Sequence, residues 1–477
     1  MSRDVPAAYD ELLDQVRQLS YVADAGGILR WDQQVMMPEG GTPARSKQQS
    51  ALSTVHHDLL TDDDLARSLA ALEDVSLESD QQALVREVRR EHERARTVPR
   101  DLVERISEAT SEALPVWEQA RQEDDFESYA PVLEELVDLR REYANAIDPD
   151  RDPYEVLFEE FEPYLGLDTV ERILGRLKEE LVPLIEDVAE SDVTQPRPFD
   201  GTFDVEDQEA LVRAVLDELG FDWDRGRLDT SAHPFTSGTQ FDARITTRFD
   251  EEKPLDSLSS TIHEFGHATY ALGLPDDQYG TPLGEARDLT VHESQSRLWE
   301  NHVGRSRAFW KFITPVVEEH LGVDVSAGEA YGAANRVYDD NLIRVEADEL
   351  TYHMHILVRF EIERDLIAGD LDVREVPQVW NDKMDEYLGV RPETDAEGCL
   401  QDIHWTNGTF GYFPTYTLGS VLAAQLYEAA EEEIGPIDDA VRDGEFDDLH
   451  EWLTENVHRH GKRYTTDELI EEATGDP

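Results

Sequence analysis

Five consecutive residues, His263-Glu264-Phe265-Gly266-His267, constrain the fold and chemistry of this chain more than any other feature. On a helix of about 3.6 residues per turn, positions four apart lie on one face about 6 Å apart, so both imidazoles can bind one metal ion. Glu264 then lies beside that ion, placed to take a proton from a bound water whose pKa falls to about 7. The motif predicts a helix, a Zn²⁺ site and a hydrolase with Glu264 as its general base.

The residues around this motif support the helix that it requires. Apolar residues recur there at helical spacing, Pro254 precedes them and Gly273 follows them. We expect one buried helix over residues 255–272. Gly266 costs such a helix about 1 kcal/mol relative to alanine, which indicates that the substrate or another backbone segment approaches closely there. A motif this short also arises by chance, so it needs support from elsewhere in the chain.

A catalytic zinc site usually has three protein ligands and one open position, so a third ligand must come from another segment. Glu293 is the best candidate, in a stretch that predicts the next helix, packed antiparallel on the first. Glu285 and Glu300 are rivals, and His292 is a minor one. The alternative for Glu293 is an ion pair with Arg297 four residues on, worth a few tenths of a kcal/mol.

Helical periodicity dominates the rest of the chain. Apolar positions with charged outer faces predict helices over residues 10–23, 80–97, 99–123, 129–146, 168–190, 204–219 and 327–369. The one alternating, extended stretch is 238–248, just before the motif helix. This strand is expected either to hold an extended peptide by main-chain hydrogen bonds or to form a small stabilising hairpin. No long Gly- or Ser-rich linker divides the chain, so we expect a single, predominantly α-helical domain over residues 1–477.

The charge is extreme. Lys and Arg number 43 against 107 Asp and Glu, a formal net charge of −64, which argues against unassisted binding to nucleic acid or to an anionic membrane. The acidity is spread along the chain and only six lysines occur, a pattern that resembles haloarchaeal proteins. Concentrated salt screens the self-repulsion of such a fold, so we expect its stability to need salt. A mesophilic acidic protein is the alternative.

Targeting and redox features are few. The single cysteine, Cys399, cannot form an intramolecular disulfide, and the first residues lack the basic, then apolar order of a signal peptide. No apolar run approaches the length of about 18 residues that a membrane span needs. We expect a soluble, cytoplasmic protein.

Separated motifs resemble the thermostable carboxypeptidase Taq family of metallocarboxypeptidases. In chain order they are Trp31 to Pro38, His233 to Phe235, Asp242 to Thr246, His263 to His267, His292 to Arg297, Ile343 to Asp348, Gly398 to Trp405 and Gly411 to Gly419. So many blocks in the family's order are far more specific than one short motif. The similarity extends over nearly the whole chain.

The resemblance implies a carboxypeptidase that removes single residues from peptide C-termini with broad side-chain tolerance. It implies an all-α, neurolysin-like zincin fold, a helical bowl with a deep groove and one small β-sheet, and generally a homodimer. Carried over by motif, His263, His267 and Glu293 are the metal ligands and Glu264 is the general base. Zn²⁺ is the expected metal, although such ligands also accept Co²⁺ or Mn²⁺. The alternatives are a related zinc oligoendopeptidase that cuts internal bonds of short peptides, and a helical scaffold without activity.

An exopeptidase must bind the terminal carboxylate of its substrate, which the planar fork of arginine does best. Arg344 and Arg244 are the candidates, and we favour Arg344 because the family places its motif at the cleft. The alternative for Arg344 is a structural ion pair with Glu346, Asp348 or a neighbouring helix.

The remaining substrate-binding candidates have less defined roles. Tyr412, Tyr416 and His404 can each donate a hydrogen bond to the oxyanion of the tetrahedral intermediate. Gln401 and Asp402 are expected either to contact the substrate or to orient a histidine ring. His233 either binds substrate or shapes a turn, because it precedes a proline.

Overall fold

The computed structural model describes residues 7–338 and 341–475, and most of them are helical. The first helices are α1 (Ala7–Val35), α2 (Thr42–Leu60), α3 (Asp63–Ala71), α4 (Ser79–Thr97), α5 (Arg100–Glu123), α6 (Phe126–Ile147), α7 (Pro153–Phe158), α8 (Leu167–Ala189) and α9 (Val205–Glu218). The middle of the chain adds β1 (Gly226–Thr230), β2 (Thr236–Thr239), β3 (Asp242–Thr247), α10 (Pro254–Gly273), α11 (Leu289–Arg297) and a π-helix (Leu298–Gly304). The last helices are α12 (Arg307–Leu321), α13 (Ala327–Ala334), α14 (Glu349–Ala368), α15 (Val376–Leu388), α16 (Pro414–Ile434), α17 (Ile437–Asp443), α18 (Asp447–Asn456) and α19 (Thr466–Thr474).

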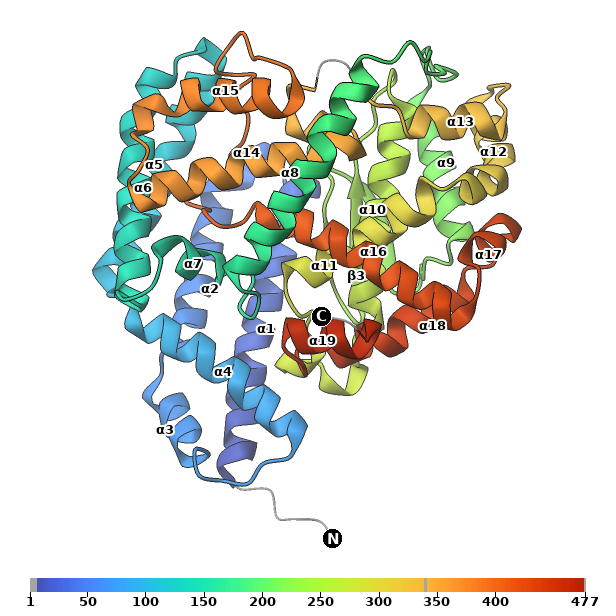
Figure 1. Cartoon of the computed structure of the whole chain (residues 1–477). Coiled ribbons are helices and arrows are strands. Elements are labelled where there is room, and N and C mark those ends of the chain that lie inside the picture. The colour runs from blue at the N-terminus through green and yellow to red at the C-terminus, as the bar shows by residue number, and fades with distance from the viewer. Residues whose placement is uncertain (1–6, 339–340, 476–477) are drawn as a thin grey trace.

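Two large hydrophobic cores organise these helices. One core contains residues of the motif helix α10, and we call this part of the molecule the motif half; its core residues lie within 199–330 and 422–470. The second core has its residues within 117–185 and 354–418, and we call this part the opposite half. In Figure 1 the opposite half, with α5, α6, α14 and α15, lies on the left, and the motif half, with α9, α10, α12 and α13, lies on the right. α16 belongs to both, because Leu418 packs in one core and Leu422 in the other.

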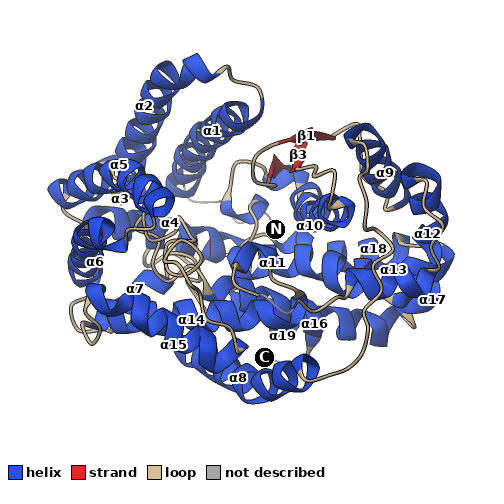
Figure 2. Ribbon diagram, turned by 90° about the horizontal axis from the view of Figure 1, so that it is seen from above, coloured by secondary structure: helices blue, strands red, loops and turns tan. Residues whose placement is uncertain are grey.

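The small sheet lies against the motif helix. Its order is β1-β3-β2, with β1 parallel and β2 antiparallel to β3, and Figure 2 shows β1 and β3 beside α10 at the edge of the molecule. Ala243 and Ile245 of β3 are buried in the same core as α10. The sheet therefore supports α10 from the side of β3.

The helices predicted over 80–97, 99–123, 129–146, 168–190 and 204–219 are confirmed within a few residues as α4, α5, α6, α8 and α9. The helix predicted over 10–23 is longer, since α1 runs from Ala7 to Val35. The motif helix, expected over 255–272, is α10. No helix among the described residues is both long and apolar enough to cross a bilayer.

The single helix predicted over 327–369 is wrong. α13 ends at Ala334 and α14 begins at Glu349, and the described residues between them contain only a short 3₁₀ helix, Arg344–Glu346. The side chain of Asp348 caps α14 by accepting from the backbone N–H of Thr351 at 3.0 Å, and it also accepts from that of Tyr338. Such side-chain bonds to the backbone compete with helix, and the apolar periodicity did not reveal them.

The strand predicted over 238–248 is two strands. β2 and β3 form a hairpin whose turn lies between Thr239 and Asp242, and β1 was missed. β3 is paired on both sides, so within this sheet a peptide could add only at an outer strand.

Gly266 allows α10 and α11 to approach closely. A Cβ atom there would lie 2.4 Å from the carbonyl oxygen of Gln295 and 2.6 Å from Cα of Ser296. The close approach expected at this glycine is therefore to another backbone segment. Contacts along the two helices run in opposite directions, since His263 meets Glu300 and His267 meets His292, so the expected antiparallel packing is confirmed.

Gly266→Ala should lower the free energy of unfolding by about 2–3 kcal/mol, because backbone atoms of α11 cannot give way as a flexible side chain would. The midpoint of denaturant unfolding measures this. Gly175→Ala is the matched control: Gly175 lies inside α8 with open space around it, so alanine there should stabilise by about 1 kcal/mol. Equal effects at the two glycines would contradict the role given to Gly266.

Candidate active site

α10 and α11 bring His263, His267 and Glu293 to one point. The Nε2 atoms of the two histidines lie 3.7 and 3.5 Å from Oε2 of Glu293, and one ligand atom from each residue lies within 4.8 Å of the others. Tetrahedral ligands about 2.1 Å from one ion would lie about 3.4 Å apart. The two distances to Glu293 are therefore close to those of a tetrahedral site, and the three side chains can hold a divalent metal ion.

Hydrogen bonds fix the orientation of both histidine rings. Nδ1 of His263 lies 2.9 Å from Oε2 of Glu300, and Nδ1 of His267 lies 2.6 Å from Nδ1 of His292. Burial, and secondly the charge of His267, lower the pKa of His292 to about 3, so that ring is neutral. Because each ligand histidine uses Nδ1 in this way, its Nε2 is directed at the metal position.

Arg297 holds the carboxylates of the site. Its Nε donates to Oε1 of Glu293 at 2.7 Å, and its Nη1 donates to Oε2 of Glu300 at 3.2 Å. Burial alone would raise the pKa of Glu293, but Arg297, followed by His263, holds it well below its usual range. The ion pair with Arg297 and the predicted metal-ligand role of Glu293 are therefore compatible, because Oε1 pairs with Arg297 and Oε2 faces the histidines.

The rival ligands have other partners. Besides His263 and Arg297, Glu300 accepts hydrogen bonds from Ser259 and Arg305, through Oε1. It lies on the π-helix that continues α11, an irregular turn that is frequent at functional sites. Glu285 accepts from Nζ of Lys462 at 2.7 Å and lies outside the group that can hold a metal ion.

Glu264 is buried beside the ligands and faces the sheet. Its Oε2 accepts a hydrogen bond of 2.6 Å from Oγ1 of Thr236, the first residue of β2. The same hydroxyl lies 3.0 Å from the backbone oxygen of Glu264. Thr236 therefore fixes the carboxylate of the expected general base.

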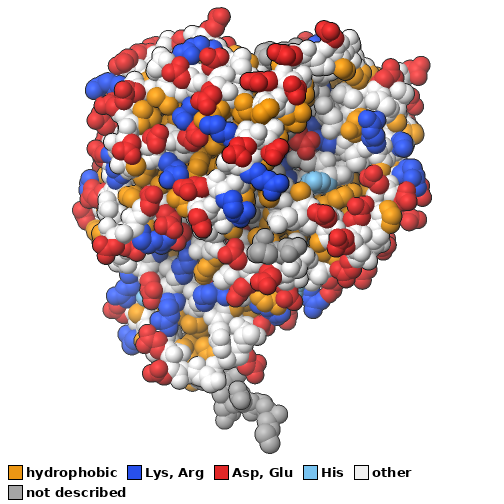
Figure 3. All heavy atoms as spheres, in the orientation of Figure 1, with side chains coloured by type: hydrophobic (Ala, Val, Ile, Leu, Met, Phe, Trp, Pro, Cys, Tyr) orange, Lys and Arg blue, Asp and Glu red, His pale blue; other side chains and the backbone are white. Residues whose placement is uncertain are grey.

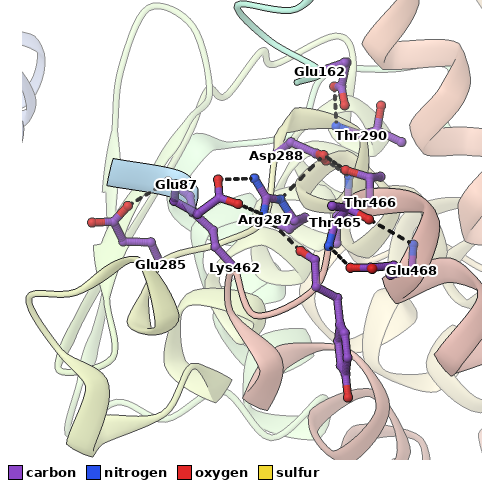
Figure 4. Close-up of polar contacts among 12 residues, drawn as sticks. Glu87, Glu162, Glu285, Arg287, Asp288, Thr290, Lys462, Thr465, Thr466 and Glu468 are labelled. Atoms are coloured by element: carbon purple, nitrogen blue, oxygen red, sulfur yellow. Dashed lines mark hydrogen bonds and ion pairs between the residues drawn. The ribbon is translucent and has the colours of Figure 1, made fainter. Parts of the chain in front are cut away.

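A buried polar network fixes the start of α11 (Figure 4). Asp288 caps the helix by accepting from the backbone N–H of Val291 at 3.0 Å, and it also accepts from the hydroxyl of Thr466. Glu162 accepts from the backbone N–H of Thr290 at 2.7 Å. Burial, and secondly the charge of Asp288, raise the pKa of Glu162 well above its usual range.

Arg287 connects this network to the N-terminal helices. It donates two hydrogen bonds, of 3.0 and 2.8 Å, to Glu87 on α4, and another to the backbone oxygen of Tyr464 (Figure 4). Such a paired fork is the strong geometry for an arginine and a carboxylate. α4, the segment before α11 and the C-terminal segment are thus tied together behind the ligand Glu293.

Six of the predicted substrate-binding residues form one cluster: Arg344, Gln401, Asp402, His404, Tyr412 and Tyr416. Nε and Nη2 of Arg344 donate to Oδ1 of Asp402 at 3.1 and 2.8 Å, and its backbone N–H donates to Gln401 at 2.8 Å. The Arg344 guanidinium also lies 5.3 Å from the ring centre of Tyr416. Gln401 and Asp402 therefore hold Arg344 in place.

Arg359, which the sequence analysis missed, supports the same cluster. It is fully buried on α14 and donates to Oδ2 of Asp402 at 2.6 Å and to Gln401 at 2.7 Å. Because Arg359 also binds Asp402, the carboxylate that pairs with Arg344 is itself held in place. The only sequence signal was an arginine inside the apolar run Ile356 to Phe360.

The tyrosines of the cluster adjoin the ligand helix. The rings of Tyr412 and Tyr416 lie 5.4 Å apart, as do those of Tyr412 and His404. Burial, and secondly the charge of Glu293, raise the pKa of Tyr412. α16 also packs directly on the ligand, because a Cβ atom at Gly419 would lie 2.6 Å from Cβ of Glu293.

Two predicted residues lie outside this cluster. Arg244 pairs with Asp242, its neighbour on β3, at 2.6 Å, and its guanidinium lies 4.3 Å from the ring of Trp31 on α1. His233 is exposed between β1 and β2, and its backbone oxygen accepts from Ser231. Both belong to the sheet and the turns beside it.

Comparison with known proteins identifies the family. The model of the carboxypeptidase Taq (M32) metallopeptidases matches residues 11–477. The chain belongs to this family. Thermostable carboxypeptidase 1 of Thermus thermophilus is 39% identical over 98% of this chain and 95% of its own length, and carboxypeptidase 1 of Bacillus subtilis is 35% identical over 98% and 94%.

Solved structures of the M32 family have the same fold. The Pyrococcus furiosus carboxypeptidase superposes with a TM-score of 0.96 at 36% identity, covering 99% of this chain and 96% of that one. Trypanosoma cruzi metallocarboxypeptidase 1 gives 0.94 at 38%, covering 98% and 96%. A putative oligoendopeptidase F, at 16% identity and a TM-score of 0.63, shares the fold alone. The chain is a metallocarboxypeptidase, a peptide hydrolase that uses a divalent metal ion, on the predicted predominantly helical fold.

Glu300→Gln should weaken metal binding in this M32 protein by roughly 10- to 100-fold, because His263 loses the charged partner of its Nδ1. Competition with a chelator at equilibrium measures the affinity. Glu285→Gln is the control, because it removes the same charge from a residue that pairs with Lys462 instead. If both variants bind metal as tightly as the parent protein, Glu300 does not orient His263.

Proposed function

We propose that this protein is a zinc carboxypeptidase that removes single residues from the C-termini of peptides with broad specificity, with Glu264 as its general base. The observation that carries the proposal is the convergence of His263, His267 and Glu293, with Glu264 held beside them by Thr236. Two imidazoles and one carboxylate are the ligand set of many catalytic zinc sites, although Co²⁺ or Mn²⁺ would also bind. The His263 and His267 side chains are 18% and 15% exposed, so solvent and substrate can reach them.

A bound zinc ion supplies a Lewis acid and makes a water molecule acidic enough to lose a proton near neutral pH. Glu264 accepts that proton on its carboxylate and later gives it to the nitrogen of the leaving amino acid. Thr236 donates to Oε2, which orients the carboxylate throughout. Glu300 and His292 keep the two ligand rings turned to the same point.

Arg344 is proposed to bind the terminal carboxylate. A guanidinium has five N–H donors, and three bonds of this group, two to Asp402 and one to Tyr352, are made within the described part of the chain. One N–H on each terminal nitrogen is left for a substrate. The pair with Asp402 is thus compatible with substrate binding and also fits the structural role considered for Arg344.

The aromatic residues beside Arg344 complete the proposed substrate site. The charge of Glu293 acts on Tyr412 and Tyr416, and His404 lies beside Tyr412, so one of these three is proposed to donate to the oxyanion at the cleaved bond. Gln401 and Asp402 act by holding Arg344. Arg244 and His233 lie by the sheet, where they would contact more distant residues of the peptide.

A zinc oligoendopeptidase is the second candidate function. A group that binds the terminal carboxylate of the substrate distinguishes a carboxypeptidase from it. An enzyme that cuts internal bonds needs no group for a terminal carboxylate, whereas Arg344 is held with two free N–H groups. The Arg344 anchor favours the carboxypeptidase.

We further propose one structural domain, a homodimer and adaptation to high salt in the cytoplasm. The shared helix α16, which packs in both cores, supports the single domain. Acidic side chains are scattered over the whole face seen in Figure 3, among basic, hydrophobic and other groups, in keeping with the charge of −64 and with salt-dependent stability. The homodimer rests on the family resemblance.

Digestion of an unblocked decapeptide by the zinc-loaded protein in high salt should give a ladder of products, each one C-terminal residue shorter. Mass spectrometry reads it directly. Glu264→Gln should keep the metal content of the parent and lose roughly 10²- to 10⁴-fold in kcat, because only the proton acceptor is removed. Internal fragments, or an active Glu264→Gln variant, would contradict the proposal.

Arg344→Gln should lower kcat/KM on a peptide acid by roughly 10- to 100-fold, because a charge-assisted pair with the terminal carboxylate is lost. The same peptide with an amidated C-terminus should be a poor substrate for both proteins, with little further loss in the variant. Arg244→Gln tests the other arginine. If Arg244→Gln shows the larger loss on the free acid, the anchor has been assigned to the wrong residue.

A further inference from the structure

Glu363 is a buried carboxylate behind the loop of residues 404–412, which begins with His404 and ends with Tyr412. It lies on α14 with a side chain wholly inaccessible to solvent. Three groups donate to it: Oε1 accepts from Nε1 of Trp405 at 2.8 Å, and Oε2 accepts from the backbone N–H of Gly411 at 3.0 Å and from the hydroxyl of Tyr154 at 3.1 Å. It lies outside every motif that carried the family resemblance.

Two of these donors are chain neighbours of the proposed substrate-binding residues. Trp405 follows His404, and Gly411 precedes Tyr412. One carboxylate thus holds the loop at both of its ends. Gly411 has little freedom to move elsewhere: its φ is +88°, and a Cβ atom there would lie 2.8 Å from the backbone nitrogen of Phe158.

We propose that Glu363 is a positioning residue of the substrate site, which in its charged form fixes the loop that presents His404 and Tyr412. The inference rests on the proposed function, because those two residues are proposed to contact the substrate. Glu363 acts through Trp405 and Gly411 and touches no substrate itself.

The charge of Glu363 is finely balanced. Burial raises its pKa to about 7, although the hydrogen bonds from Gly411, Trp405 and Tyr154 all favour the carboxylate. Of the three donors, only the hydroxyl of Tyr154 can also accept a hydrogen bond. An added proton is therefore shared with Tyr154, and the bonds from Trp405 and Gly411 lose their assistance from the charge.

Other charges near Glu363 are paired. The titratable and charged side chains that act on Glu363 directly are Tyr154 at α7 and Arg359 on α14. Arg364 on α14 and Asp152 at α7 act on its partner Tyr154. Arg359 is bound to Asp402, and Arg364 to Glu171. Their pairing leaves Glu363 as the group of this set that changes charge near neutral pH.

The sign of the pH effect separates positioning from stability. The pKa of Glu363 in the folded protein lies above its ordinary value, so the contribution of this group to folding stability is present at low pH and lost as pH rises through about 7. The bonds to Trp405 and Gly411 change in the opposite sense and strengthen as the carboxylate forms. A role in stability alone would therefore not improve substrate binding at higher pH.

The indole N–H of Trp405 reports the charge of Glu363 directly. In protein with nitrogen-15 in its tryptophans and no metal bound, its resonance is assigned by its loss in Trp405→Phe. Between about pH 5.5 and about pH 9 we expect it to shift with a midpoint near 7, and to stay fixed in Glu363→Gln. The wild-type titration is a test in itself, whether or not the variant folds.

Kinetics test the consequence for the substrate. Above the pH at which Glu363 loses its proton, Glu363→Gln should lower kcat/KM about ten-fold, mainly by raising KM, because the loop loses about one charge-assisted bond. For the wild-type protein we expect KM to rise below pH 7, and Glu363→Gln should lose this rise. Glu361→Gln is the matched control on the same helix: Glu361 accepts from Lys383 and Tyr387, away from the loop, and should keep the wild-type KM profile.

A Trp405 resonance that does not move near pH 7, or that moves equally in Glu363→Gln, overturns the inference. So does a Glu363→Gln variant with the wild-type KM profile. Failure of the proposed function would look different, since the wild-type protein would then show no metal-dependent trimming of C-termini whatever the Trp405 resonance does.

Discussion

The close contact of α10 with α11 is the constraint on which the site depends. With glycine at 266, the carbonyl oxygen of Gln295 lies where a side chain would otherwise be. The short distance between α10 and α11 lets His263 and His267 on one helix lie near enough to Glu293 on the other to bind the same metal ion. The same register places Glu300 and His292 behind the two rings. Ligands and their orienting partners therefore follow from one helix contact.

Arginine, rather than lysine, holds the interior of this acidic protein together. Arg287, Arg297, Arg344 and Arg359 are each buried or nearly so, and each forms two or more bonds or a ring contact. The planar fork of arginine carries five N–H donors, so one side chain can satisfy several acceptors in little space, as Arg297 does for Glu293 and Glu300. The excess acid lies on the surface, where salt can screen it, while the carboxylates of the site have fixed partners. The surface charge and the chemistry of the site are thus physically separate.

The sequence predicted what depends on local spacing. The motif helix, the return of a second helix with Glu293, and five helices with strong periodicity all depend on residues a few positions apart. The helix over 327–369 failed because side-chain capping at Asp348 leaves no trace in apolar periodicity. Arg359 and Glu363 were missed because their partners lie far along the chain, up to 209 residues away for Tyr154 and Glu363. Such pairs exist only after the two halves have packed.

α16 makes the metal site and the proposed substrate site one rigid unit. Its first turns carry Tyr416 and pack in the opposite half, while Gly419 lies against Glu293 and Leu422 enters the motif half. A change in the angle between the halves would therefore have to move Glu293 with α16 or break this contact. The distance from the metal position to Tyr416 is accordingly set by the contact of α16 with α11. A carboxypeptidase needs that fixed distance, because it measures a single residue from the terminal carboxylate to the bond it cuts.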